Sequence, residues 1–137
     1  MTELAFDTSA AIPFLVRTHV AHSAVRDHAV GRTPALTTQS LAETYSVLTR
    51  LPGDARVGPD DAVRLIEANF QAVLAVPNDE QLTLPRVLAD LEIAGGAVYD
   101  ALVGLAARAA SAPLLTRDAR ADGTYRSLGV VIEIPAA

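Results

Sequence analysis

The chain has 137 residues, a formal net charge of −5 and no cysteine. These features exclude disulfide bonds and thiolate metal sites, and they make the chain a poor general binder of nucleic acid, because phosphate contacts need positive charge. Half of the residues are apolar, as in a globular protein, and we expect a single domain over residues 1–137. The chain opens with an acid rather than a basic segment, and no apolar run approaches the ~20 residues of a membrane span. We therefore expect a cytoplasmic protein with no membrane partner.

Short apolar strands alternate with helices along the chain. We predict strands at 3–6, 34–38, 72–77, 112–116 and 129–134. We predict a first helix after Asp7, capped by Thr8 or Ser9, and further helices at 19–30, 40–51, 58–70, 79–94 and 97–110, with a short helix or turn at 119–128. Pro13 is expected in or near the first turn of its helix, where proline is tolerated, and Pro85 is a candidate interruption of 79–94. This alternation indicates an α/β sandwich in which helices cover both faces of a parallel sheet.

Four carboxylates have positions that ordinary surface acids do not explain well. Asp7 and Asp118 follow predicted strands, and ligands of open α/β sheets bind beyond the carboxyl ends of the strands. Glu43 and Asp100 lie within predicted helices that contain few basic residues. The helix around Asp100 is so apolar that an unpaired buried acid would be costly there.

The four acids need a counter-charge if they converge. Two carboxylates ~5 Å apart repel by roughly 3 kcal/mol at an effective dielectric constant near 20. The chain has no lysine, so a divalent cation that prefers oxygen ligands, Mg²⁺ or Mn²⁺, is the simplest solution. Structural alternatives stay open for single residues: Asp7 could form an Asx turn, Asp118 could cap a following helix, and Glu43 could be solvated.

The order of these acids resembles the PIN domain, and within it the VapC-type toxins of type II toxin–antitoxin pairs. The resemblance is carried by "AFDTSA" around Asp7, "LAETYSVL" around Glu43, "YDALVGLAA" around Asp100 and "LLTRD" ending at Asp118. It covers nearly the whole chain, and the last two segments together are its most specific part. It implies a PIN-like three-layer sandwich with a central parallel β-sheet flanked by helices. Pro13 departs from what we expect in the first helix of this family.

The resemblance implies a metal-dependent endoribonuclease whose acidic site holds Mg²⁺ or Mn²⁺. The implied catalytic residues and metal ligands are Asp7, Glu43, Asp100 and Asp118. Metal ions in such a site activate a water molecule that hydrolyses an RNA phosphodiester, and they supply the positive charge that the chain lacks. Arg117 and Arg120 either hold flanking phosphates or are plain surface residues.

Three further residues are candidates for supporting roles. Thr116 is implied to support the site through its hydroxyl group. Ser9 either bonds to Asp7 or caps the first helix, with the cap slightly favoured, and Asp122 is a candidate extra acid four residues after Asp118.

The resemblance also implies protein partners. It implies a cognate VapB-like antitoxin that covers the site, often with a basic residue among the carboxylates. It further implies a homodimer or a toxin–antitoxin hetero-oligomer, and RNA as the substrate.

Two alternatives belong to other functional classes. Phosphoacceptor receiver domains and haloacid-dehalogenase-type phosphatases also have acidic Mg²⁺ pockets, but both families need an active-site lysine, which this chain lacks. The remaining alternative is a catalytically inactive PIN-fold module with a binding or regulatory role. The identity of the RNA, the number of metal ions and the choice between Mg²⁺ and Mn²⁺ do not follow from the residues.

Overall fold

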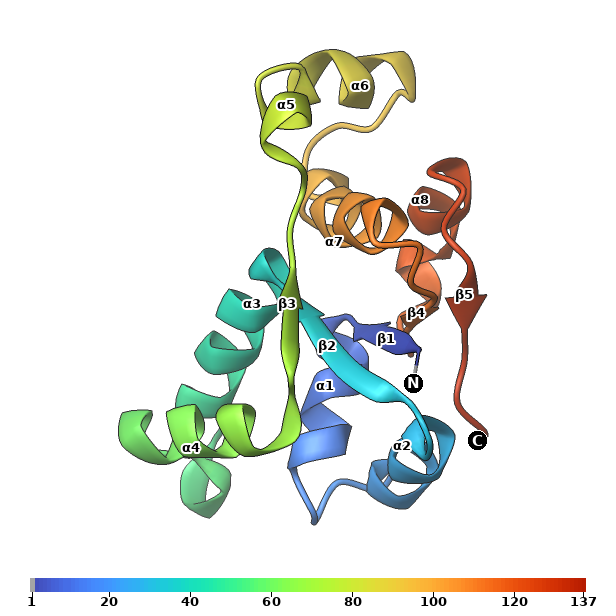
Figure 1. Cartoon of the computed structure of the whole chain (residues 1–137). Helices are drawn as coiled ribbons and strands as arrows, with labels where there is room; N and C mark the ends of the chain where they lie inside the picture. The colour runs from blue at the N-terminus through green and yellow to red at the C-terminus, as the bar shows by residue number, and fades with distance from the viewer. Residues whose placement is uncertain (1) are drawn as a thin grey trace.

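A five-stranded parallel sheet forms the centre of the protein. The structure is a computed structural model that describes residues 2–137 (Figure 1). The sheet has the order β3-β2-β1-β4-β5, and every pair of neighbouring strands runs parallel. Its strands are β1 (Glu3–Phe6), β2 (Thr33–Thr37), β3 (Ala72–Leu74), β4 (Leu114–Leu115) and β5 (Ile132–Glu133).

Eight α-helices connect and cover these strands. They are α1 (Thr8–Leu15), α2 (His22–Ala29), α3 (Thr38–Thr49), α4 (Pro59–Asn69), α5 (Asn78–Gln81), α6 (Leu84–Asp90), α7 (Ala97–Ala109) and α8 (Asp122–Ser127). Two 3₁₀ helices, η1 (Gly53–Ala55) and η2 (Ala119–Ala121), complete the described part of the chain. In Figure 1, α7 and α8 lie on one side of the sheet, α1 and α4 lie on the other, and α5 and α6 extend beyond α7. The predicted three-layer sandwich is confirmed.

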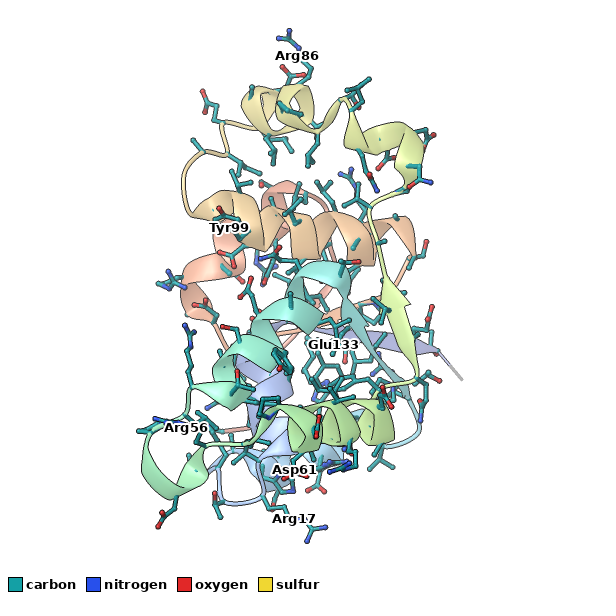
Figure 2. The ribbon with its side chains drawn as sticks, turned by 90° about the vertical axis from the view of Figure 1, so that its left-hand side faces the viewer. Arg17, Arg56, Asp61, Arg86, Tyr99 and Glu133 are labelled. Atoms are coloured by element: carbon teal, nitrogen blue, oxygen red, sulfur yellow. The ribbon has the colours of Figure 1, made fainter. Side chains whose placement is uncertain are left out.

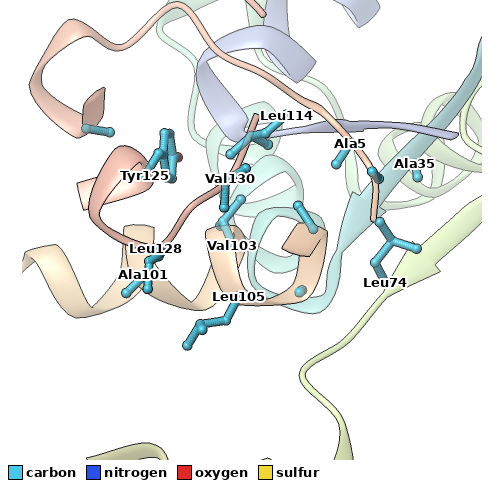
Figure 3. Packing of buried hydrophobic residues seen from close by; sticks show 14 of the residues in the cluster. Ala5, Ala35, Leu74, Ala101, Val103, Leu105, Leu114, Tyr125, Leu128 and Val130 are labelled. Atoms are coloured by element: carbon cyan, nitrogen blue, oxygen red, sulfur yellow. The ribbon is translucent and has the colours of Figure 1, made fainter. Parts of the chain in front are cut away.

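Each face of the sheet buries its own hydrophobic core, because successive residues of a strand point to opposite faces. Ala5, Ala35 and Leu114 face the core that contains α7 and α8 (Figure 3). Phe6 and Leu36 face the core under α1 to α4. In that second core the ring of Phe6 packs against two other phenylalanine rings, with centroids 4.9 and 5.2 Å away. Burial on both faces explains why these strands are continuous apolar runs rather than alternating ones.

The predicted boundaries are wrong at several places, each for a local reason. The helix predicted at 19–30 begins only at His22. The segment predicted as helix at 79–94 is two helices, α5 and α6, and the interruption considered at Pro85 is present, because Pro85 lies in the first turn of α6, where a missing N–H costs little. The strand predicted at 129–134 shrinks to Ile132–Glu133, because Gly129 has a φ of +76° and forms a turn.

The start of α1 also differs from the prediction. Asp7 is its N-cap, with its side chain accepting the Ala10 N–H, so neither Thr8 nor Ser9 caps the helix. Pro13 lies inside α1, beyond its first turn, yet the helix continues to Leu15.

No helix within residues 2–137 is both long and apolar enough to cross a membrane. The cytoplasmic location stays a prediction. The single domain over residues 1–137 stays a prediction as well.

Candidate functional site

The four predicted acids surround the carboxyl end of the sheet. Asp7 directly follows β1, and Asp118 lies three residues beyond the end of β4. Glu43 is in the second turn of α3, the helix that starts where β2 ends, and Asp100 is in the first turn of α7. Acids early in a helix are favoured by the positive end of its dipole. Four separate elements therefore bring the acids to one edge of the sheet.

Asp7 is the most buried of the four acids, with 5% of its surface exposed. Its Oδ1 accepts hydrogen bonds from Ser9 Oγ at 2.6 Å and from the Ala10 N–H at 3.2 Å. Its Oδ2 accepts from Thr116 Oγ1 at 2.5 Å and from the Tyr125 hydroxyl at 2.9 Å. A carboxylate has about four lone-pair sites, so each now has a donor. Burial raises the pKa of Asp7, and these four hydrogen bonds oppose that shift.

The two hydroxyl groups next to Asp7 also fasten β4 to the site. Ser9 Oγ accepts the Arg117 N–H at 2.7 Å, and Thr116 Oγ1 accepts the Asp118 N–H at 3.1 Å. Thr116 lies beside Asp7, as the resemblance implied. For Ser9, the bond to Asp7 is the alternative that the structure supports, and the favoured helix cap was wrong.

Glu43 and Asp100 face each other across an open cleft of about 540 Å³. The cleft is lined by Gln39, Glu43, Gly96, Ala97, Tyr99, Asp100, Arg120 and Thr124. Glu43 accepts hydrogen bonds from Gln39 Nε2 at 2.7 Å and from Thr8 Oγ1 at 3.4 Å. Tyr99, the neighbour of Asp100, is 58% exposed at the surface (Figure 2). The cleft thus combines two acids, one arginine and an accessible aromatic ring.

Asp100 has the clearest electrostatic signature. Burial raises its pKa, and the negative charges of Asp118, Asp7 and Glu43 raise it further, while Arg120 lowers it. No hydrogen bond to its carboxylate is found among residues 2–137. Asp100 is therefore half-buried, and the charges of the other three acids act on its carboxylate. This convergence of the four acids is the arrangement considered from the sequence.

Asp118 has the helix-capping role considered for it and also forms an ion pair with Arg120. It caps η2 by accepting the Arg120 N–H at 3.0 Å, and its other oxygen accepts from Arg120 Nη2 at 2.8 Å. Asp122 lines a separate small cavity beside Asp118. The carboxylate of Asp122 is bound by Arg126 at 2.9 Å, an ion pair at i,i+4 spacing on α8. Asp122 is therefore near the acidic group but does not line the cleft of Asp100.

Sequence reasoning missed the contribution of Tyr125. This residue is 1% exposed, and its hydroxyl reaches Asp7 from 118 residues away in the chain. Burial and the charge of Asp7 raise the pKa of Tyr125, so its hydroxyl acts as a donor. No local pattern around Tyr125 indicates this contact, because it depends on how α8 docks against β1.

The donor set fits a hard divalent cation in its chemistry. All four acids offer oxygen, the ligand that Mg²⁺ and Mn²⁺ prefer, and the charges of the other three acids add to burial in raising the pKa of Asp100. In the described part of the chain, however, no three Asp, Glu or His side chains lie close enough together to hold one ion. The catalytic and metal-binding roles of these residues stay predictions.

A parallel sandwich with acids along the carboxyl edge of the sheet defines a PIN-type fold, and the comparisons with known proteins agree. A family model described as PIN domain matches residues 4–126. The chain belongs to the PIN-domain family, and within it to the VapC type.

Two relatives match over nearly their full length. Ribonuclease VapC27 of Mycobacterium tuberculosis is 56% identical over 133 residues, covering 97% of this chain and 97% of the relative. Ribonuclease VapC40 of the same organism is 41% identical, covering 96% of this chain and 98% of the relative.

Solved structures share the fold at low identity. VapBC2 from Rickettsia felis, bound to a promoter DNA fragment, matches with a TM-score of 0.71 and 13% identity, over 98% of this chain and 100% of that one. VapC20 of Mycobacterium tuberculosis, described as a toxin that cleaves the sarcin–ricin loop, matches with a TM-score of 0.64 and 15% identity, over 88% of this chain and 94% of that one.

Proposed function

We propose that this protein is a metal-dependent endoribonuclease and the toxin of a toxin–antitoxin pair. The proposal is supported by PIN-family membership and by a relative at 56% identity that is named a ribonuclease. The observation that carries it is Asp100, whose pKa is raised by burial and by the other three acids beside an open cleft. Perturbed acids in a cleft are typical of functional sites.

The proposed metal ligands are Asp7, Glu43, Asp100 and Asp118, and the proposed ion is Mg²⁺ or Mn²⁺. When bound, the ion would supply the positive charge that activates a water molecule and stabilises the phosphodiester during hydrolysis.

The chain's own residues have distinct tasks in this proposal. Ser9, Thr116 and Tyr125 fix the orientation of Asp7 through the hydrogen bonds described above. Gln39 does the same for Glu43. Asp100 faces the cleft without a hydrogen-bond partner in the described residues, so its carboxylate is available to accept a proton from the attacking water.

The proposed partners are RNA and a VapB-like antitoxin. Solved structures with this fold include VapBC2 and FitAB, each bound to a DNA fragment. We further propose that the protein assembles as a homodimer or with its antitoxin as a hetero-oligomer.

A second candidate, a PIN-fold module that binds without cutting, is favoured by one observation. Three of the four carboxylates are occupied by protein donors: Asp7 has four, Glu43 has two, and Asp118 is bound by Arg120. A non-cutting module would keep this arrangement when divalent ions are added, whereas a nuclease would not.

The first experiment is cleavage of purified total RNA by antitoxin-free protein with added Mg²⁺ or Mn²⁺. Wild type should produce discrete fragments, and EDTA should abolish them. Asp100→Asn should reduce the rate by at least about 100-fold, because it removes a charge at the reacting centre. Asp90→Asn, at an exposed position on α6, is the matched control and should cut like wild type.

Two results would contradict the nuclease proposal. One is cleavage that persists in EDTA and in Asp100→Asn, which would indicate a contaminating ribonuclease or a different site. The other is intact RNA together with no binding of Mn²⁺ in calorimetry, which would favour the non-cutting module.

A further inference from the structure

Arg120 lies beside three of the four acids. Its backbone N–H and its Nη2 bind the two different oxygens of Asp118, at 3.0 and 2.8 Å. The same side chain lines the cleft that contains Glu43 and Asp100. A single arginine thus contacts one acid directly and faces two others.

The charges of the group act on Arg120 in return. The hydrogen bond to Asp118 and the charges of Asp118 and Asp100 raise the pKa of Arg120. Arg120 in turn lowers the pKa of Asp100, opposing burial and the other three acids. The guanidinium group therefore relieves repulsion among the carboxylates, as a bound cation would.

The ion pair between Arg120 and Asp118 is exposed and can break easily. The Arg120 side chain is 84% exposed, whereas the Asp118 side chain is only 23% exposed. Exposed ion pairs contribute little stability, and the arginine can turn into solvent without opening the core. If the guanidinium leaves, the Asp118 oxygen that it occupied becomes available to another cation, while the backbone N–H still orients the carboxylate through its other oxygen.

We propose that Arg120 is a resident counter-cation of the acidic site, which neutralises Asp118 until a divalent cation displaces it. This inference rests on the proposed function, because it assumes that the four acids bind such an ion. In the structure, Asp118 is held toward Arg120 by their ion pair. In this role Arg120 sets the metal affinity of the site rather than acting as a metal ligand.

The test is Mn²⁺ binding measured by calorimetry and by the loss of the free-ion electron paramagnetic resonance signal. Arg120→Gln should bind Mn²⁺ about two- to fivefold more tightly than wild type, because the ion no longer competes with an exposed ion pair. Arg120→Lys keeps the charge and should bind nearly as weakly as wild type. The gain in Arg120→Gln should shrink between about 20 mM and about 300 mM salt, because added ions screen exposed charges.

Arg126→Gln is the matched control. Arg126 also forms an ion pair with an acid, Asp122, and both residues lie on α8, but Arg126 does not line the cleft. Its removal changes the net charge by the same amount and should leave Mn²⁺ affinity unchanged. A circular dichroism melt of each variant confirms that it is folded.

Three results would overturn the inference. Equal Mn²⁺ affinity for wild type and Arg120→Gln would show that Arg120 does not compete, and would leave the proposed metal site intact. Weaker binding by Arg120→Gln would show that Arg120 assists the ion. No Mn²⁺ binding by wild type or any folded variant would overturn both this inference and the proposed metal dependence.

Discussion

Two groups of charged side chains in this protein are built in opposite ways. In one group, Glu133 of β5 accepts two hydrogen bonds from Arg32, at 3.0 and 2.9 Å, and lies 2.7 Å from His28 Nε2. In the other, four acids lie near one another, and Arg120 forms an ion pair with one of them, Asp118. The first group lowers the pKa of its acid, chiefly through the hydrogen bond from Arg32. In the second group the pKa values are raised: that of Asp7 by burial, and that of Asp100 by burial and then by the charges of the other three acids.

The comparison separates charged groups that stabilise the folded state from charged groups that destabilise it. Glu133 ties β5 to the segment between α2 and β2, so its interactions favour the folded state. Asp100 has the opposite effect, because folding buries its carboxylate and moves it closer to like charges. Substitutions of Glu133 and of Asp100 should therefore differ in sign, whereas Asp7, which has four hydrogen-bond donors, stabilises the fold as Glu133 does.

The largest effect on stability is expected from Asp7→Ala. The change removes the N-cap of α1 and leaves the buried hydroxyls of Thr116 and Tyr125 without their acceptor. We expect a loss of about 3 kcal/mol in the free energy of unfolding, measured by urea denaturation. Asp100→Ala is the matched variant and should be as stable as wild type or more stable. Equal losses in both variants would contradict the distinction between a hydrogen-bonded acid and a repelled one.

Tyr125→Phe is expected to have the next largest effect. The ring still fills the core (Figure 3), but Oδ2 of Asp7 loses one of its two donors. We expect RNA cleavage to slow by about tenfold and stability to fall by about 1 kcal/mol. Tyr45→Phe, at an exposed ring on α3, should change neither. Unchanged cleavage by a folded Tyr125→Phe would show that the hydroxyl does not orient Asp7 for catalysis.

Glu133→Gln should produce a smaller, pH-dependent loss. The variant loses the ion pair to Arg32 and the carboxylate oxygen that contacts His28 Nε2, and we expect a loss of about 1 kcal/mol at neutral pH. Because the folded-state pKa of Glu133 lies below its ordinary value of 4.5, the stabilisation is present above pH 4.5 and disappears as the pH falls through the folded-state pKa. Thermal melts of both proteins at a series of pH values test this. A stability difference that grows as the pH falls would have the wrong sign.

Asp122→Asn should have the smallest effect. The pair with Arg126 is exposed and at i,i+4 spacing, so we expect a loss of a few tenths of a kcal/mol and no change in RNA cleavage. A strong loss of cleavage in a variant that melts like wild type would assign Asp122 to the active site after all.

The sequence was sufficient to predict the parallel sheet and the general position of the acids at its carboxyl edge. Parallel strands that are buried on both faces appear as short apolar runs, and Asp7 follows β1 at a place where ligands bind such sheets. Boundaries were harder to predict, because a proline can either interrupt a helix or start one, and at Pro85 it starts α6.

The contacts around the acids could not be predicted in this way. For Ser9 the helix cap was slightly favoured, because capping is a local property of the sequence. Its contacts with Asp7 and with the Arg117 N–H form where β1 lies beside β4. The role of Tyr125 depends on the docking of α8. The direction of the Arg120 side chain depends on the turn of η2, which places its N–H and guanidinium on the same carboxylate.

The contacts of Asp7 also have a consequence for synthesis of the chain on the ribosome. Two of the four donors to Asp7, Thr116 and Tyr125, are 109 and 118 residues further along the chain. During translation Asp7 therefore leaves the exit tunnel long before these two donors exist. The hydrogen bonds around Asp7 cannot be completed until the ribosome has translated Tyr125 and released it from the tunnel.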